Sequence, residues 1–232
     1  MAKQPTPKSQ AEIEAIQAIF QAQSPEERIK AGEQLIVKFA DTEFKALALF
    51  LIAASYEQMN DFDKMAVYAE QVLKEDPEDY KSMLMLARGI AVKTREHDLD
   101  RDEKLARSEK YAKQALEVLK TAPKPNPELT DEQWEGAKKD FEAQAHEAYA
   151  AGAMARKDLE KAMEHYQTAY KTQANPDPVL MIRYAQAANM AKKPDQAIAV
   201  LDEVTSMADL HPSLKSAAEG EKQKAIKMKS GQ

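Results

Sequence analysis

Apolar residues recur along this chain with the spacing of amphipathic helices. Between Ala46 and Pro77, large and small apolar residues fall three or four positions apart, and the turn-prone pair Asn60-Asp61 divides the stretch in two. Four segments of the chain can be laid over one another in this way, at a period of 34 residues. Because no run alternates valine and isoleucine with polar residues, the pattern predicts pairs of helices and no sheet.

The offsets within the period carry a family resemblance. With Ala46 as position 1, the packing positions hold Leu49, Ile52, Ala53, Tyr56, Phe62, Met65, Ala69, Val72 and Leu73, and Pro77 closes the unit. This spacing resembles the tetratricopeptide repeat (TPR) family. The resemblance implies an all-α fold, a right-handed α-solenoid of about five TPR-like units with an interrupted middle and a C-terminal solvating helix. It also implies a role in protein–protein interaction.

The repeats predict one solenoid domain over residues 10–229, after a disordered lead at 1–9. Its middle departs from the pattern through an acidic insertion at 94–104, a proline-rich linker at 121–127 and an overlong helix at 130–156. A capping box, Thr130 to Gln133, marks the start of that helix. The expected units are about 12–45, 46–79, 80–122, 130–177 and 178–211, with a capping helix at 213–229.

Composition narrows the class of function. The net charge of −6 leaves no basic footprint for phosphates, so we expect no nucleic-acid partner. The absence of cysteine excludes disulfides and thiolate chemistry. The longest apolar run, 46–54, is too short to span a bilayer, and the start has no apolar signal segment. We expect a soluble chain, either cytoplasmic or exported with its signal removed.

The sequence shows no catalytic constellation. The histidines, His97, His146, His165 and His211, never stand at i and i+4, and no P-loop, nucleophile elbow or dinucleotide glycine motif occurs. His146 falls at position 4 of its unit, where a packed, hydrogen-bonded histidine is expected. The sequence therefore predicts no enzyme, no cofactor and no metal centre.

One pattern leaves a metal alternative open. The ligand spacing of an EF-hand calcium loop is present in Asp98, Asp100, Asp102 and Glu109. However, Glu103 stands where that loop requires glycine, and residues from 104 onward have helical character. A solvated acidic insertion is the favoured interpretation, with a calcium loop as the alternative.

The resemblance also implies a binding surface. In TPR proteins, ligands usually lie against the first helix of each pair, at positions 2, 5, 9, 12 and 13. Carried over, these positions form a mostly apolar groove with two arginines. The predicted contacts are Phe50, Ala54, Leu84, Arg88, Met154, Ile182, Arg183, Gln186, Asn189 and Met190, with Arg183 beside the others at position 6. Glu57 and Glu147 also fall at these ligand positions. The carboxylate clamp of chaperone-binding TPR proteins is absent, because Phe50 and Ala54 replace its lysine and asparagine.

We therefore expect a non-enzymatic scaffold or adaptor that binds a peptide or protein segment in this groove, with Arg88 and Arg183 meeting acidic or amide groups. The competing interpretation is that Phe50, Leu84 and Ile182 only pack against neighbouring helices. A second hypothesis is a self-associating structural protein, in which Trp134 and Phe141 form a patch, unless the 94–104 insertion covers them. An enzyme accessory subunit is the remaining alternative. The partner and the oligomeric state stay open.

Overall fold

Eleven helices make up the part of the chain that the structure describes. The structure is a computed structural model that describes residues 5–231, and no strand occurs within them. The helices are α1 (Gln10–Gln21), α2 (Pro25–Lys38), α3 (Lys45–Gln58), α4 (Phe62–Glu75), α5 (Tyr80–Lys93), α6 (Arg101–Thr121), α7 (Asp131–Ala155), α8 (Leu159–Thr172), α9 (Pro178–Met190), α10 (Pro194–Thr205) and α11 (Pro212–Ser230).

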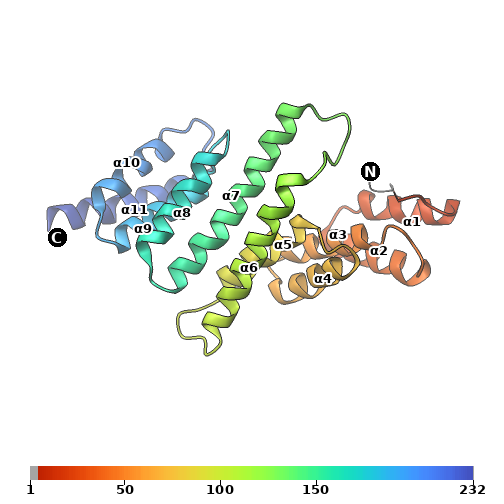
Figure 1. The fold of residues 1–232 in the computed structure, drawn as a ribbon. Coiled ribbons are helices and arrows are strands. Elements are labelled where there is room, and N and C mark those ends of the chain that lie inside the picture. The colour runs from red at the N-terminus through yellow and green to blue at the C-terminus, as the bar shows by residue number, and fades with distance from the viewer. Residues whose placement is uncertain (1–4, 232) are drawn as a thin grey trace.

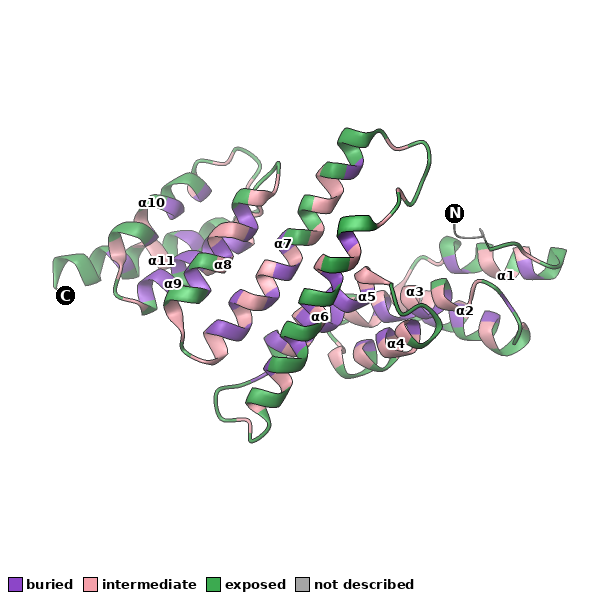
Figure 2. Ribbon diagram, in the orientation of Figure 1, coloured by how far each residue is buried: buried purple, intermediate pink, exposed green. Residues whose placement is uncertain are grey.

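The helices stack in chain order. Each helix packs on the next one, and α5 also packs on α7, as α9 does on α11. Figure 1 shows the resulting elongated array, with α1–α4 at one end, α8–α11 at the other and the long helices α6 and α7 between them. The purple, buried residues of Figure 2 are spread along the whole array, on the helices of every pair. The predicted all-α solenoid is confirmed.

The turn inside three helix pairs has the same backbone conformation. Asn60, Lys157 and Lys192 all occupy position 15 of their units and have φ values of 58°, 59° and 57°. The following amide donates to the carbonyl five residues earlier at 2.8–2.9 Å, in the pairs Asp61–Tyr56, Asp158–Ala153 and Lys193–Ala188. In the unit with the insertion, Thr94 at this position has a φ of −70°. The insertion therefore replaces the repeat's own turn.

Side-chain caps define several helix starts. The Ser24 hydroxyl accepts from the backbone N–H of Glu27, and Pro25 is the first residue of α2. Thr130 and Gln133 form the predicted capping box, with reciprocal backbone-to-side-chain bonds of 2.9 and 3.1 Å. These bonds satisfy amide groups that a helix start leaves without an internal partner. The long helix that the capping box predicted is present as α7, with 25 residues.

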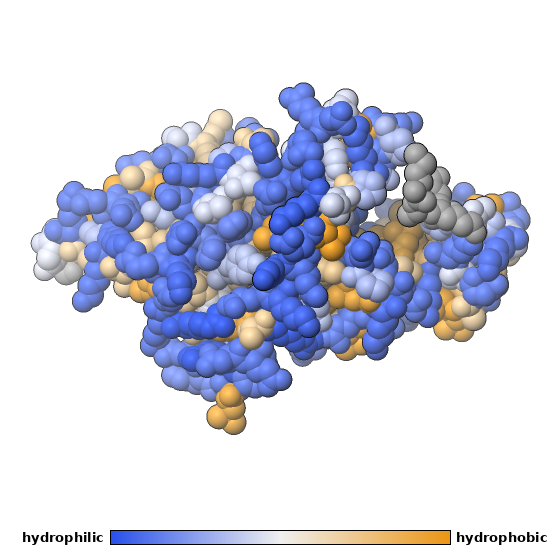
Figure 3. Space-filling view, viewed as in Figure 1, coloured by the Kyte–Doolittle hydropathy of each residue, from blue (hydrophilic) through white to orange (hydrophobic). Residues whose placement is uncertain are grey.

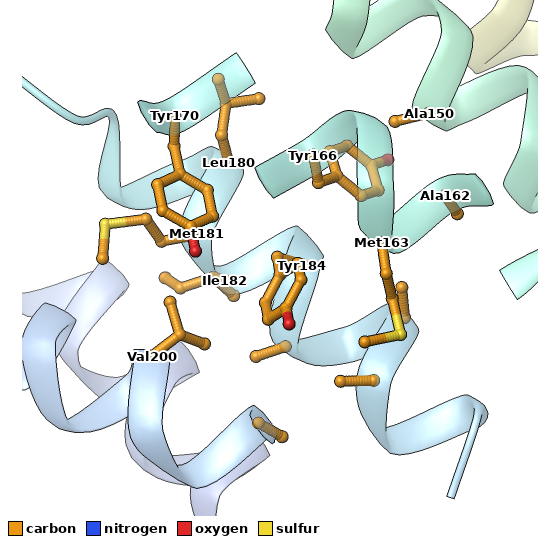
Figure 4. Packing of buried hydrophobic residues seen from close by; sticks show 14 of the residues in the cluster. Ala150, Ala162, Met163, Tyr166, Tyr170, Leu180, Met181, Ile182, Tyr184 and Val200 are labelled. Atoms are coloured by element: carbon orange, nitrogen blue, oxygen red, sulfur yellow. The ribbon is translucent and has the colours of Figure 1, made fainter. Parts of the chain in front are cut away.

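The core runs through the array between neighbouring helices. Small residues lie where helices approach most closely: Ala53 and Ala69 are fully buried, and a Cβ added to Gly89 would overlap the Met65 side chain. The cluster that joins α7 to α11 contains Tyr166 and other large side chains, which point toward one another in Figure 4. One helix pair cannot bury such a face alone, so the stacking itself stabilises each unit.

The interrupted middle differs from the prediction. The loop between α5 and α6 spans residues 94–100, whereas residues 101–104, predicted as insertion, form the first turn of α6. The extra residues therefore lengthen α6 to 21 residues instead of forming a larger loop. Residues 122–130 then connect α6 to α7, and the linked ends of the two helices extend beyond their neighbours in Figure 1.

The N-terminal lead is more ordered than expected. Residues 1–4 lie outside the described part, but the Thr6 amide donates to Glu43 Oε2 at 2.9 Å, and Lys8 Nζ lies 2.7 Å from Asp41 Oδ2. The Lys8 amide also donates to the buried carboxylate of Glu12 at 2.6 Å. These bonds hold residues 6–8 against the loop before α3, so the expectation of disorder is wrong for this segment.

The array ends in α11, which covers the last helix pair. Ala218 and Ala225 are fully buried against α9 and α10, while most of the remaining α11 side chains are exposed. Among residues 5–231, none of the helices combines the length and apolar character that crossing a membrane requires.

Candidate binding face

A row of ion pairs crosses the first helices of four consecutive pairs. Arg88 on α5 has Nη2 2.7 Å from Glu57 Oε1 on α3, and Nη1 3.7 Å from Glu147 Oε2 on α7. Glu147 also accepts a hydrogen bond from Arg183 on α9. We name these four residues, Glu57, Arg88, Glu147 and Arg183, the charge ladder. Because it joins α3, α5, α7 and α9, the ladder lies on the face that the repeat pattern predicts for ligands.

The charge ladder is partly shielded from solvent and electrically balanced. Its central carboxylate, Glu147, has a side chain only 16% exposed, and the other three side chains are roughly twice as exposed. Partial burial strengthens such pairs relative to fully exposed ones. Arg88 Nε is buried and has no hydrogen-bond partner among the described residues. Because two acidic and two basic groups alternate, the ladder adds no net charge to this face.

Tyr166 on α8 lies close to the ladder within the core. Burial raises the pKa of its hydroxyl to about 12, while the Arg183 charge lowers this pKa and the Glu147 charge raises it. The hydroxyl therefore stays neutral at physiological pH and leaves the charge balance of the face unchanged.

Apolar side chains accompany the ladder. Val92 and Met190 are 48% and 54% exposed, and both occupy position 13 of their units, as half-buried Ala155 does in the unit between them. Phe50 is half-buried, with Lys81 Nζ 5.9 Å from its ring centroid. Elsewhere the visible surface in Figure 3 is mostly hydrophilic, with apolar residues in small separate patches. The face thus combines paired charges with exposed apolar groups.

Three predicted groove residues are instead covered by neighbouring helices. Leu84 is fully buried and packs with α6 and α7, and Ile182 lies inside the cluster of Figure 4. The Asn189 side chain donates to Glu221 of α11 at 3.1 Å and is buried there. The prediction that these three contact a ligand is therefore wrong. At least partial exposure is found for the other predicted contacts, Phe50, Ala54, Arg88, Met154, Arg183, Gln186 and Met190.

The predicted self-association patch is not exposed. Trp134 is only 5% exposed, and its indole Nε1 donates to the carbonyl of Ala122 at 3.3 Å. Phe141 is half-buried and packs edge-on against Tyr80, with ring centroids 5.0 Å apart. The prediction of a patch is wrong, because the linker and α5 contact these rings. The residues that contact the two rings, Ala122 and Tyr80, lie outside the 94–104 insertion.

The calcium-loop alternative is also wrong. An EF-hand loop needs a sharp turn at its sixth position, whereas this chain is helical from Arg101, the fourth position, onward. Each carboxylate is paired with a cation: Asp98 and Asp100 with Lys104, Asp102 with Arg101, and Glu109 with Arg156. No group of three or more histidine, aspartate or glutamate side chains in the described part could hold a metal ion.

Two histidines from different helices meet within one unit. His146 Nδ1 on α7 lies 3.1 Å from His165 Nδ1 on α8, and the Tyr149 ring is 5.2 Å from that of His165. Burial lowers the pKa of both imidazoles, and the neighbouring His165 lowers that of His146 further. The packed, hydrogen-bonded histidine predicted at 146 is confirmed, with a second histidine as its partner.

Comparison with known proteins supports the repeat. The family profile of the tetratricopeptide repeat matches residues 153–219, which cover α8 to α10 and the start of α11. Residues 153–219 therefore match the tetratricopeptide repeat family. The fold of the chain is similar to that of a thermophilic TPR protein from Thermus thermophilus, with a TM-score of 0.64 at 13% identity over 90% of this chain and 98% of that one.

An assembly chaperone of RpL4 aligns with a TM-score of 0.46 and 12% identity, over 97% of this chain and 99% of that one. No curated protein matches this chain.

Sequence reasoning placed Arg88 and Arg183 on one face of the array but missed the pairing of their charges. Arg88 and Arg183 were predicted to be available to a ligand, whereas both are bonded to glutamates of neighbouring units. The sequence does contain a signal of this pairing. Glu57, Arg88 and Glu147 fall at positions 12, 9 and 5 of their units, and the repeat assigns these positions to one face. Opposite charges at such positions in adjacent units indicate pairing across them.

Proposed function

We propose that this protein is a non-enzymatic scaffold that binds a peptide or protein segment on the face lined by α3, α5, α7 and α9. The observation that carries the proposal is the charge ladder with exposed apolar side chains beside it. The TPR fold itself suits interaction with proteins, because stacked helix pairs create an extended concave surface. Partner recognition would then depend on the side chains of this surface.

The partner segment in this proposal is mainly apolar. Val92 and Met190 offer exposed contact area, and methionine side chains adapt to different shapes. A helix with one apolar stripe suits a face of this kind. An acidic partner gains little from Arg88 or Arg183, because it would only exchange one carboxylate for another. This replaces the expectation that the two arginines meet acidic groups.

The test introduces charge on the apolar part of the face. The double variant Val92→Asp/Met190→Asp would force two carboxylates to lose water on binding, so capture of a partner from source-cell lysate should fall by about tenfold or more. The matched control is Val67→Asp on the second helix of its pair, where the side chain is 55% exposed. Because all three positions are exposed, melting curves should show that every variant is folded.

Equal capture of the partner by the double variant and the control would contradict the proposal that the partner binds on this face. Replacing the arginines would be a weaker test, because Arg88→Glu with Arg183→Glu would bring four carboxylates together at the ladder. Loss of capture would then be difficult to separate from loss of fold.

A further inference from the structure

His146 and His165 form a pair of titratable groups that the proposed function does not use. His146 comes from α7 and His165 from α8, and their Nδ1 atoms lie 3.1 Å apart. The ring centroids are 5.2 Å apart and the ring planes are tilted by 42°. Both side chains are half-buried. In the absence of an ion, one Nδ1 carries the proton and donates to the other.

This separation is also the one that two imidazole ligands of a single metal ion require. Zinc–nitrogen bonds are about 2.0–2.1 Å long. Two nitrogens bound to one ion at an angle between the octahedral 90° and the tetrahedral 109° therefore lie about 2.8–3.4 Å apart. The observed 3.1 Å falls within this range. Imidazole is a preferred ligand of zinc, nickel and copper ions.

The contact keeps at least one ring in the form that a metal needs. Two protonated Nδ1 atoms would repel each other at 3.1 Å, so at least one Nδ1 has a free electron pair. Nearby charges of both signs, Glu164 and Lys161 on α8 and Glu109 on α6, act on the pair. On metal binding the shared proton moves from Nδ1 to Nε2 of the same ring, so no net proton release is required.

Solvent reaches the pair through surface clefts. His165 lines a cleft of about 460 Å³ together with Tyr149 and Glu109, and His146 lines a second cleft of about 370 Å³ between α6 and α7. An ion and its water ligands therefore have a route to the rings.

We propose that His146 and His165 chelate one divalent ion of the late first transition series, such as zinc, nickel or copper. Water completes the coordination, because no third histidine or carboxylate of residues 5–231 gathers with them. Such an ion would connect α7 to α8, the two helices of the unit that follows the interruption. This inference does not depend on the proposed binding of a partner.

Isothermal titration of the full, untagged chain with zinc chloride and nickel chloride tests the proposal. One ion should bind per chain. His146→Gln and His165→Gln should each weaken binding by about tenfold or more, since even loss of an outer-shell partner costs about 10–100-fold. The control His97→Ala, at an exposed histidine of the α5–α6 loop, should bind as the wild type does.

Nitrogen NMR of the histidine rings provides a second measurement on the unaltered chain. Saturation with zinc should shift the Nδ1 resonances of His146 and His165 and leave that of His97 in place. Absence of binding, binding that survives in both glutamine variants, or shifts confined to other histidines would overturn the proposal and leave the pair as a hydrogen bond only.

Discussion

Glu147 is the carboxylate on which the charge ladder depends, and its neutralisation should be measurable as lost stability. It accepts a charge-assisted hydrogen bond from Arg183 and lies 3.7 Å from Arg88. A charge-assisted bond contributes about 1.5–3 kcal/mol, whereas an exposed ion pair contributes about 0–1 kcal/mol. The Glu147 side chain is mostly buried but that of Arg183 is one-third exposed, so we expect Glu147→Gln to cost about 1–2 kcal/mol after solvent screening.

Thermal unfolding followed by circular dichroism measures this cost. For a chain of this length, 1 kcal/mol corresponds to about 2–4 °C, so the Tm of Glu147→Gln should fall by about 2–8 °C. The matched control is Glu142→Gln on an exposed position of the same helix, which should leave the Tm within about 1 °C. The difference should narrow in about 1 M salt, because the ladder is only partly shielded. Equal Tm values for both variants would refute a stabilising ladder.

Three further predictions follow from the fold. Lys192→Gly should stabilise the chain by about 0.5–1 kcal/mol, because Lys192 has a φ of 57° that glycine adopts without strain. The control Lys110→Gly within α6 should destabilise the chain by a similar amount. Urea midpoints that shift in the same direction for both variants would contradict this prediction. Trp134→Ala should lower the free energy of unfolding by about 3–5 kcal/mol, because Trp134 is buried within its own chain. The mass measured by light scattering should stay unchanged, and a changed mass would support self-association through Trp134. Acid should destabilise the chain, because the pKa values of His146 and His165 lie below the ordinary value of 6.5, so the unfolded chain takes up these protons first. The contribution of the two histidines to the free energy of unfolding is complete above pH 6.5 and is lost as the pH falls through their pKa values in the folded chain. A variant with both histidines changed to glutamine should therefore show a flatter profile of stability against pH between about pH 7 and 5. Parallel profiles for the variant and the wild type would contradict this prediction.

The features that the sequence predicted well depend on short-range spacing. The small residues Ala53 and Ala69 are buried because the repeat places them between paired helices, and a period of 34 residues is enough to locate them. Thr130 and Gln133 are three residues apart, so their capping box is visible in the sequence itself. Helix pairing and the location of the interruption followed from the same local pattern.

The features that were missed depend on contacts between distant residues. Leu84 was assigned to the groove by its repeat position, but α7 packs on α5 and buries it. Arg88 bonds to a residue 31 positions earlier, and Arg183 to one 36 positions earlier, so their pairing requires the relative placement of whole units. Trp134 is covered by a linker whose path no periodicity describes.

Site-specific photocrosslinking in the source cell would show whether the face lined by α3, α5, α7 and α9 binds a protein segment. A benzophenone amino acid at position 92 or 190 would stand on this face, and the same group at position 67 would stand on the second-helix side, at similar exposure. The account predicts one discrete protein adduct from positions 92 and 190 and none from position 67. Adducts from position 67 alone, or none from any position, would contradict it.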